Sequence, residues 1–252
     1  LALVKPAVGA WDLRDWLAAR GEAWVEDPAN ENPAYARARA RRALAAGGEV
    51  PPDPAATRRA AGARCVTGAH LLQAPRQALR MDPLDEAARL VAAACLSVSG
   101  GSRPPRPEAS RRLAERLIAD GPVTATLAGA RVEADEAEVR FMRHPGEMAR
   151  RGVGPLALAG GDAGVWDGRY EVTARQDVVV RPVAGLASQL GRADQALLKS
   201  LPPGARGALP AILAGDGPPR LGREGGDDAD VRPLALMRFR GAAGLIEDEA
   251  GI

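Results

Sequence analysis

Apolar positions in the first half of the chain recur three and four residues apart, the period of helices that are packed along one face. This spacing predicts a helix that starts after Asp12 and stops at Gly21, and another that starts at Asn32-Pro33 and stops at Gly47-Gly48. The proline-rich segment 49–54 that follows is a candidate linker. Further alanine-rich helices are expected over about 55–79, 83–97 and 107–119.

Beyond Pro122 the apolar residues alternate with polar ones in short runs, which is the pattern of half-buried strands. The tail 232–246 predicts one or two final strands, and the Gly- and Asp-rich stretch 222–230 predicts a loose, disordered-like loop. Helices followed by strands in this order indicate an α+β fold. The earlier strands are expected at 123–127, 130–134, 139–143 and 178–183, and residues 165–172 predict a turn followed by another strand.

Composition places the chain among globular proteins and argues against two kinds of site. Apolar residues make up 46% of the chain, yet no run is long enough to span a membrane. Two cysteines and two histidines, Cys65, Cys95, His70 and His144, have no metal-ligand spacing, so we expect reduced thiols and no metal site. The net charge of +2 is too small to indicate nucleic-acid binding by itself.

The most specific segment precedes the helix that starts at Pro33. Asp27-Pro28-Ala29-Asn30 has turn chemistry, because Asp and Asn side chains accept hydrogen bonds from nearby backbone amides. This turn would determine where the helix starts and therefore where its side chains point.

Four arginines on that helix are candidate phosphate ligands. Arg37 and Arg41 lie one turn apart on one face, while Tyr35, Arg39 and Arg42 share another. Two guanidinium groups at this spacing can bind successive phosphates, or a phosphate and a substrate carboxylate. The alternative is a solvated basic face without a ligand.

The segment resembles the tRNA(Ile)-lysidine synthetase family of PP-loop ATPases, in which Asp-Pro-Ser-Asn precedes an aromatic residue and Arg-Asn-x-x-Arg. Ala29 and Ala38 replace the family's Ser and Asn. Weaker similarities continue through Pro104-Pro105-Arg106, Thr126–Val132, Val165–Tyr170 and Leu209–Ala211, and the last forty or so residues match little. The matching positions are Asp27, Pro28, Asn30, Tyr35, Arg37 and Arg41.

The resemblance implies a fold in three parts and a role for each. Residues 1–48 would be the tail of the α/β PP-loop domain, 49–120 a helical substrate- and tRNA-binding domain, and 121–252 a mixed, largely β C-terminal domain. Arg37, Arg39, Arg41 and Tyr35 would position tRNA or substrate, and Asp27, Pro28 and Asn30 would shape the turn.

In this bacterial, cytoplasmic family the intact enzyme uses ATP and Mg²⁺ to join L-lysine to C2 of the wobble cytidine in tRNA(Ile) with a CAU anticodon. The decoding of that tRNA changes from AUG to AUA. A homodimer is left open.

The family's ATP-binding motif, Ser-Gly-Gly-x-Asp-Ser, does not occur in this sequence. Ser99-Gly100-Gly101-Ser102 imitates its beginning, but it lacks the aspartate and continues into Arg-Pro-Pro, which cannot begin a phosphate-binding helix. We therefore expect the catalytic residues outside this chain, no ATP or Mg²⁺ bound by this chain alone, and a fragment that supplies tRNA binding without activity of its own. Two alternatives are a non-catalytic RNA-binding module and an α+β interaction domain with chance similarity.

Overall fold

A computed structural model describes residues 17–21, 42 and 66–243. Residues 17–21 and 42 belong to a first unit, Leu1–Pro52, and residues 66–243 to a second, Asp53–Ile252. In the first unit the helix ends where the sequence predicts. The amide of Gly21 donates to the carbonyl of Ala18 at 3.0 Å, and Gly21 takes a left-handed φ of 68°, which stops a helix. Arg42 is helical and exposed.

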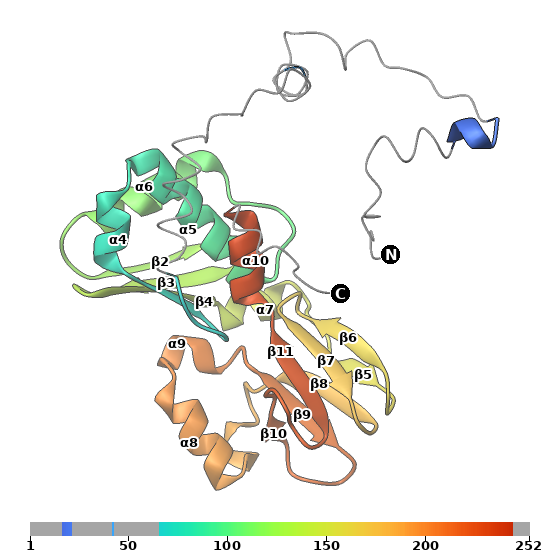
Figure 1. Cartoon of the computed structure of the whole chain (residues 1–252). Helices are drawn as coiled ribbons and strands as arrows, with labels where there is room; N and C mark the ends of the chain where they lie inside the picture. The colour runs from blue at the N-terminus through green and yellow to red at the C-terminus, as the bar shows by residue number, and fades with distance from the viewer. Residues whose placement is uncertain (1–16, 22–41, 43–65, 244–252) are drawn as a thin grey trace. The chain divides into compact units, whose positions relative to one another are not determined.

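The described residues of the second unit form two lobes. The first lobe, residues 66–143 together with 235–243, is a four-stranded antiparallel sheet in the order β1-β4-β3-β2 with helices on one face (Figure 1). Its strands are β1 (Leu72–Pro75), β2 (Val123–Leu127), β3 (Ala130–Ala134) and β4 (Glu138–Arg143). Its helices are α4 (Arg76–Met81), α5 (Leu84–Ser99), α6 (Pro107–Ile118) and α10 (Ala235–Ala242).

Local sequence explains where the long helices of this lobe begin and end. Helix α5 follows Pro83, carries Asp85 and Glu86 in its first turn, where the helix dipole favours acids, and ends at Gly100 with a φ of 65°. Helix α6 has proline at its first position. At the other end of α6, the buried Arg76 donates to the carbonyl oxygens of Leu117 at 2.7 Å and of Ala119.

One apolar core joins the helices to the sheet. Residues that are almost fully buried come from α5, α6, β3 and β4, and α10 adds Phe239. The prediction separates residues 49–120 from 121–252. In the structure the helices of the first segment and the first strands of the second share this core, and β1 pairs with β4 across that division.

The second lobe, residues 145–233, contains two antiparallel sheets around another core. One sheet has the order β10-β9-β8-β5 and the other β11-β7-β6. Trp166, Tyr170, Val180 and Val231 are among the buried residues between them. The strands are β5 (Leu156–Leu158), β6 (Ala163–Trp166), β7 (Tyr170–Ala174), β8 (Val178–Pro182), β9 (Pro210–Ala214), β10 (Arg220–Leu221) and β11 (Ala229–Pro233).

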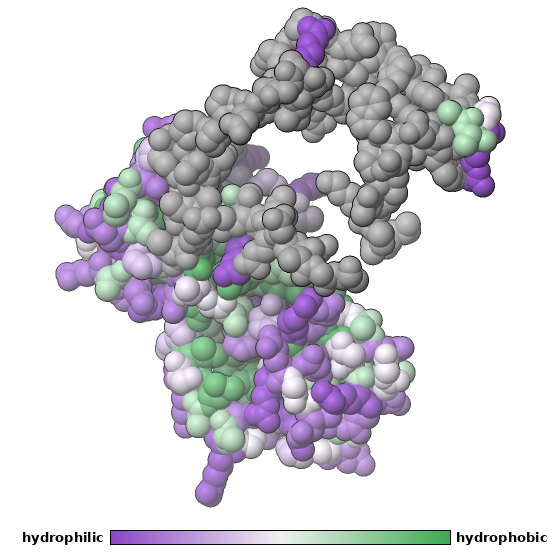
Figure 2. Space-filling model, viewed as in Figure 1, coloured by the Kyte–Doolittle hydropathy of each residue, from purple (hydrophilic) through white to green (hydrophobic). Residues whose placement is uncertain are grey.

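Short helices complete the second lobe. Leu198 of α8 packs with Leu209 and Leu221 in a further apolar cluster. Ala205 of α9 contacts Leu71 and Met142 of the first lobe, so apolar contacts also join the lobes. The helices are α7 (Pro145–Arg150), η2 (Ala187–Gln189), α8 (Arg192–Ser200) and α9 (Pro203–Arg206). Polar side chains cover much of the face seen in Figure 2, with apolar ones gathered in patches between them.

Three expectations differ from the structure. Of the helix expected over 55–79, residues 55–65 lie outside the described residues and 76–79 are helical, as the start of α4. Residues 72–75 instead form strand β1, because Leu72 and Ala74 face the core while β1 pairs with β4. The tail expected as strands becomes helix α10 after β11, since Phe239 packs into the core of the first lobe. The loop 222–230 is held by backbone and side-chain hydrogen bonds, among them that from the amide of Val231 to the carbonyl of Arg223 at 3.0 Å. Within the described ranges, no helix is long and apolar enough to cross a membrane.

Candidate nucleic-acid interface

A buried arginine–aspartate cluster lies where the two lobes meet. Arg143 ends β4 in the first lobe, and Asp167 and Arg169 belong to the turn between β6 and β7 in the second. The Arg143 guanidinium holds both carboxylate oxygens of Asp167 at 3.0 Å, and Nε of Arg169 donates to Oδ2 at 2.7 Å. The three side chains are 1%, 3% and 2% exposed. Two guanidinium groups therefore share one carboxylate in a water-poor setting.

Backbone carbonyls accept the remaining donors of the cluster. Arg169 donates to the carbonyl of Ala208 at 2.5 Å. Arg238 of α10 reaches the carbonyl of Gly101 at 2.5 Å and also that of Gly168. Helix α10, the loop after α5 and the β6–β7 turn are thereby held together at one point.

Burial changes the proton affinities of this cluster. It lowers the pKa of Arg143, against the opposing effect of the Asp167 carboxylate, and it lowers the pKa of Arg238 in the same way. Arginine nevertheless keeps its proton in proteins. The junction thus contains three positive arginines and one negative carboxylate, and Asp167 neutralises part of their charge.

His70 and Tyr170 extend the cluster on one side. Nδ1 of His70 lies 3.3 Å from the Tyr170 hydroxyl, and the Arg169 guanidinium stands 4.9 Å from the centre of the tyrosine ring. Burial raises the pKa of Tyr170. Burial and the charge of Arg169 lower the pKa of His70, so its imidazole is neutral near pH 7. Neither pKa shift activates its group, because the raised pKa keeps the Tyr170 hydroxyl protonated. The two side chains therefore pack the junction and do not form a nucleophilic site.

The loop Ser99–Ser102 does not have the geometry of a phosphate-binding loop. It begins at Ser99, the last residue of α5, and at this end of a helix unpaired carbonyls and the helix dipole repel anions. Gly100 is the left-handed cap, and a Cβ there would stand 1.7 Å from the carbonyl oxygen of Asp167. Glycine is required because the β6–β7 turn packs directly against this loop.

Two exposed arginines of α6 are candidates for phosphate contacts. Arg112 and Arg116 lie one turn apart on the solvent side, the same spacing as Arg37 and Arg41. Arg111, by contrast, is held by Asp85 at 2.7 Å. No ion pair with a described carboxylate neutralises Arg112 or Arg116, and Arg116 donates only to a backbone carbonyl, that of Thr124. Their charge is available to an anionic partner.

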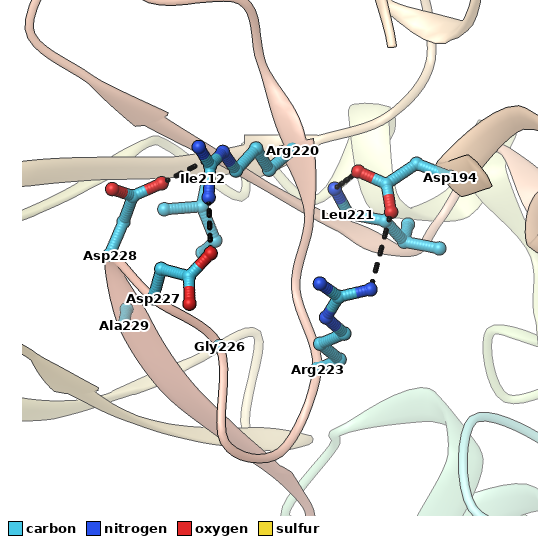
Figure 3. Close-up of a pocket in the computed structure, with 9 residues that line it drawn as sticks. All are labelled: Asp194, Ile212, Arg220, Leu221, Arg223, Gly226, Asp227, Asp228 and Ala229. Carbon is cyan, nitrogen blue, oxygen red and sulfur yellow. Dashed lines mark hydrogen bonds and ion pairs between the residues drawn. The ribbon is translucent and has the colours of Figure 1, made fainter. Parts of the chain in front are cut away.

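A second charged group, around the β10–β11 loop, is internally neutralised (Figure 3). Arg220 binds Asp227 at 2.7 Å and Asp228 at 3.3 Å. Asp194 accepts the amide of Leu221 at 2.9 Å and faces Arg223 at 3.7 Å. The hollow between them measures about 20 Å³, the space of one or two waters. The Asp194 contacts fasten the loop to α8, and the hollow has no room for a nucleotide.

The sequence-predicted site lies outside the described residues. These positions are Asp27, Pro28, Asn30, Tyr35, Arg37, Arg39 and Arg41. Cys65 also lies outside them, whereas Cys95 is buried and free, as expected. Among the residues that the structure describes, no group of three or more His, Cys, Asp or Glu side chains could hold a metal ion.

Comparison with known proteins identifies the family. The tRNA(Ile)-lysidine synthase of Caulobacter vibrioides is 40% identical over 247 residues, which cover 95% of this chain. Those of Brucella melitensis and Rhizobium meliloti are 34% and 29% identical, over 63% and 67% of the chain. The chain belongs to the tRNA(Ile)-lysidine synthase family. No family model matches it.

The chain spans only part of these lysidine synthases: 58% of the Caulobacter protein and 39% and 38% of the Brucella and Rhizobium proteins. Segments that carried the family resemblance meet at the buried cluster, because Gly129 and Asp167 both bind Arg143 there. The Trp-Asp-Gly-Arg-Tyr segment was recognised in the sequence, but nothing there indicated that its aspartate, Asp167, pairs with Arg143. Arg112 and Arg116 were not singled out from the sequence, although their spacing on an expected helix was visible there.

Proposed function

We propose that this chain is part of a tRNA(Ile)-lysidine synthase and contributes the residues that bind the tRNA. The intact enzyme would adenylate the wobble cytidine of the minor isoleucine tRNA at C2 with ATP, releasing pyrophosphate, after which the amine of lysine displaces AMP. The tRNA would then read AUA in place of AUG. The observation that carries this proposal is the 40% identity over 95% of the chain.

The described residues do not fit an ATP–Mg²⁺ site. The loop Ser99–Ser102 stands at the wrong end of a helix, and no acidic or histidine cluster is available in this part of the chain. We therefore assign ATP and Mg²⁺ to the PP-loop domain of the intact enzyme, and place the reaction in the cytoplasm. Arg37 and Arg41, with Tyr35 and Arg39 beside them, are proposed to position the tRNA. Arg112 and Arg116 are proposed as further phosphate contacts.

The first experiment measures incorporation of labelled lysine into tRNA(Ile) with a CAU anticodon. We expect none from the 252-residue chain alone and ATP-dependent incorporation once an N-terminal PP-loop domain is joined to it. Lysine incorporation by the chain alone would overturn the assignment of ATP to another domain. Tight tRNA binding without any incorporation, even with that domain joined, would instead favour a non-catalytic RNA-binding module.

The second experiment measures binding of the same tRNA at two salt concentrations. The double variants Arg37→Ala/Arg41→Ala and Arg112→Ala/Arg116→Ala should each weaken binding about tenfold or more, because each removes two charged hydrogen-bond donors. The slope of log K against log salt should fall by about one for each phosphate that the variant no longer binds. Arg111→Ala is the matched control on α6, since Asp85 already holds that side chain. Equal effects of Arg111→Ala and the α6 double variant would contradict the proposal.

A further inference from the structure

Strand β2 is an outer strand of the first sheet, no described strand pairs with its open side, and its own sequence has none of the features that usually protect an edge strand. Val123, Ala125 and Leu127 face the core under the helices, while the side chains of Thr124 and Thr126 are exposed. The strand contains no charge, no proline and no bulge. Open edges of this kind pair readily with another strand.

The turn that follows β2 determines which of its peptide groups point outward. Ala128 and Gly129, with φ of 50° and 88°, form a two-residue type I′ turn, so Leu127 and Ala130 are a hydrogen-bonded pair. Hydrogen-bonded pairs alternate along an antiparallel ladder, which turns the peptide groups of Thr124 and Thr126 away from β3.

Arg116 donates a hydrogen bond to the carbonyl of Thr124 at 3.3 Å. This contact agrees with a Thr124 carbonyl that points away from β3. The outward N–H of Thr124 and both outward groups of Thr126 have no partner among the described residues.

We propose that β2 pairs with β2 of a second copy of this chain, antiparallel and about a two-fold axis at Ala125. In this register Thr124 stands opposite Thr126 of the second copy. These are the residues whose peptide groups point outward, so four hydrogen bonds can close across the axis. A two-fold contact requires such self-complementarity, and only a register centred on residue 125 pairs all the outward groups with one another.

Side chains on the open face of the sheet also match in this register. Thr124 stands beside Glu133 in its own sheet, and Thr126 stands beside Arg131. Each row across the joined sheets therefore runs from an acidic residue of one copy, through two threonines, to a basic residue of the other. No like charges share a row, and threonine pairs stabilise neighbouring strands. The result is one continuous eight-stranded sheet.

Arg116 opposes this association. Its guanidinium occupies the Thr124 carbonyl that the second copy needs, and it carries a positive charge near the edge, as Arg112 does one turn earlier. The pairing is therefore weak and reversible in the wild-type chain, as expected for a contact of five residues a side.

Sedimentation velocity of the full chain, without RNA, tests the proposal over about three decades of concentration up to about 1 mM. We expect the mass to rise with concentration from 26.2 kDa toward twice that value. Thr126→Pro removes an outward N–H that β3 does not use, and it should remain monomeric at every concentration. Thr126→Val keeps that N–H and should associate like the wild type. Circular dichroism melts confirm that the variants fold.

Arg116→Ala and Arg112→Ala separate the hydrogen-bond effect from the charge effect. Both remove one positive charge from the exposed side of α6, but only Arg116→Ala frees the Thr124 carbonyl. Arg116→Ala should therefore lower the dimer dissociation constant at least severalfold more than Arg112→Ala does. A wild-type chain and Arg116→Ala variant that both stay monomeric would overturn the proposal, and so would a Thr126→Pro variant that dimerises like the wild type.

Discussion

At His70, burial and a neighbouring guanidinium act in the same direction. The ring is packed against Tyr170, with centroids 5.8 Å apart, and Arg169 is the charged group that faces it. Both effects disfavour the imidazolium form and lower the pKa of His70. The sequence showed only a lone histidine, because its environment comes from a tyrosine one hundred residues away.

The stability of the protein should consequently depend on pH through His70. The unfolded chain takes up a proton near pH 6.5 and the folded chain only at lower pH, so the free energy of unfolding should fall as the pH drops below about 6.5. The slope is at most about 1.4 kcal/mol per pH unit. Urea unfolding between about pH 5.5 and 7.5 measures it against His70→Gln, in which this part of the slope should vanish. An identical pH dependence in the variant would show that His70 is not the group involved.

The helices and strands themselves were largely predictable. The expected helices over 83–97 and 107–119 are α5 and α6, and the expected strands at 123–127 and 130–134 are β2 and β3 to the residue. Local signals suffice there, since prolines and glycines bound the helices and alternation marks the strands. The predictions for the segments that form strand β1 and helix α10 were wrong because long-range packing decided them.

Substitution of Gly100, the C-cap of α5, tests how tightly the β6–β7 turn packs against the end of this helix. Gly100→Ala places a Cβ 1.7 Å from the carbonyl oxygen of Asp167, in addition to the cost of a left-handed alanine. Gly152→Ala has the same φ of 65° but no atom within 4 Å, and should lose only about 1–2 kcal/mol of stability. Gly100→Ala should lose clearly more, measured by urea unfolding of both variants. Equal losses would mean that the loop after α5 moves away from the β6–β7 turn without cost.

In the second unit, Asp167 forms the buried ion pair that joins the two lobes. Its carboxylate neutralises Arg143 from the first lobe and Arg169 from its own turn, and α10 adds Arg238 at the same point. The apolar contact of Ala205 with Leu71 and Met142 supports the junction nearby. The described parts of the lobes therefore depend on one another, through a charge that is fully buried.

Asp167→Asn should destabilise the protein by about 3–5 kcal/mol, because it leaves two arginines buried without a counter-charge. Asparagine tolerates the positive φ of 50° at this position, so the loss reports the charge and not the backbone. Asp120→Asn, which removes the exposed partner of Arg80, should change stability little. Thermal unfolding followed by calorimetry compares the two variants. Similar melting temperatures for both would contradict the role assigned to Asp167.

The sequence by itself determined the family, the order of most helices and strands, and the absence of the ATP-binding motif from this chain, because each depends on residues close together along the chain. Only the tertiary structure decided that helices 76–118 and strands 123–143 share one core, and that Arg143 meets Asp167. It also decided that the β6–β7 turn packs against the loop after α5, so closely that only glycine fits at position 100. Such pairings depend on contacts between distant residues, which no local spacing encodes.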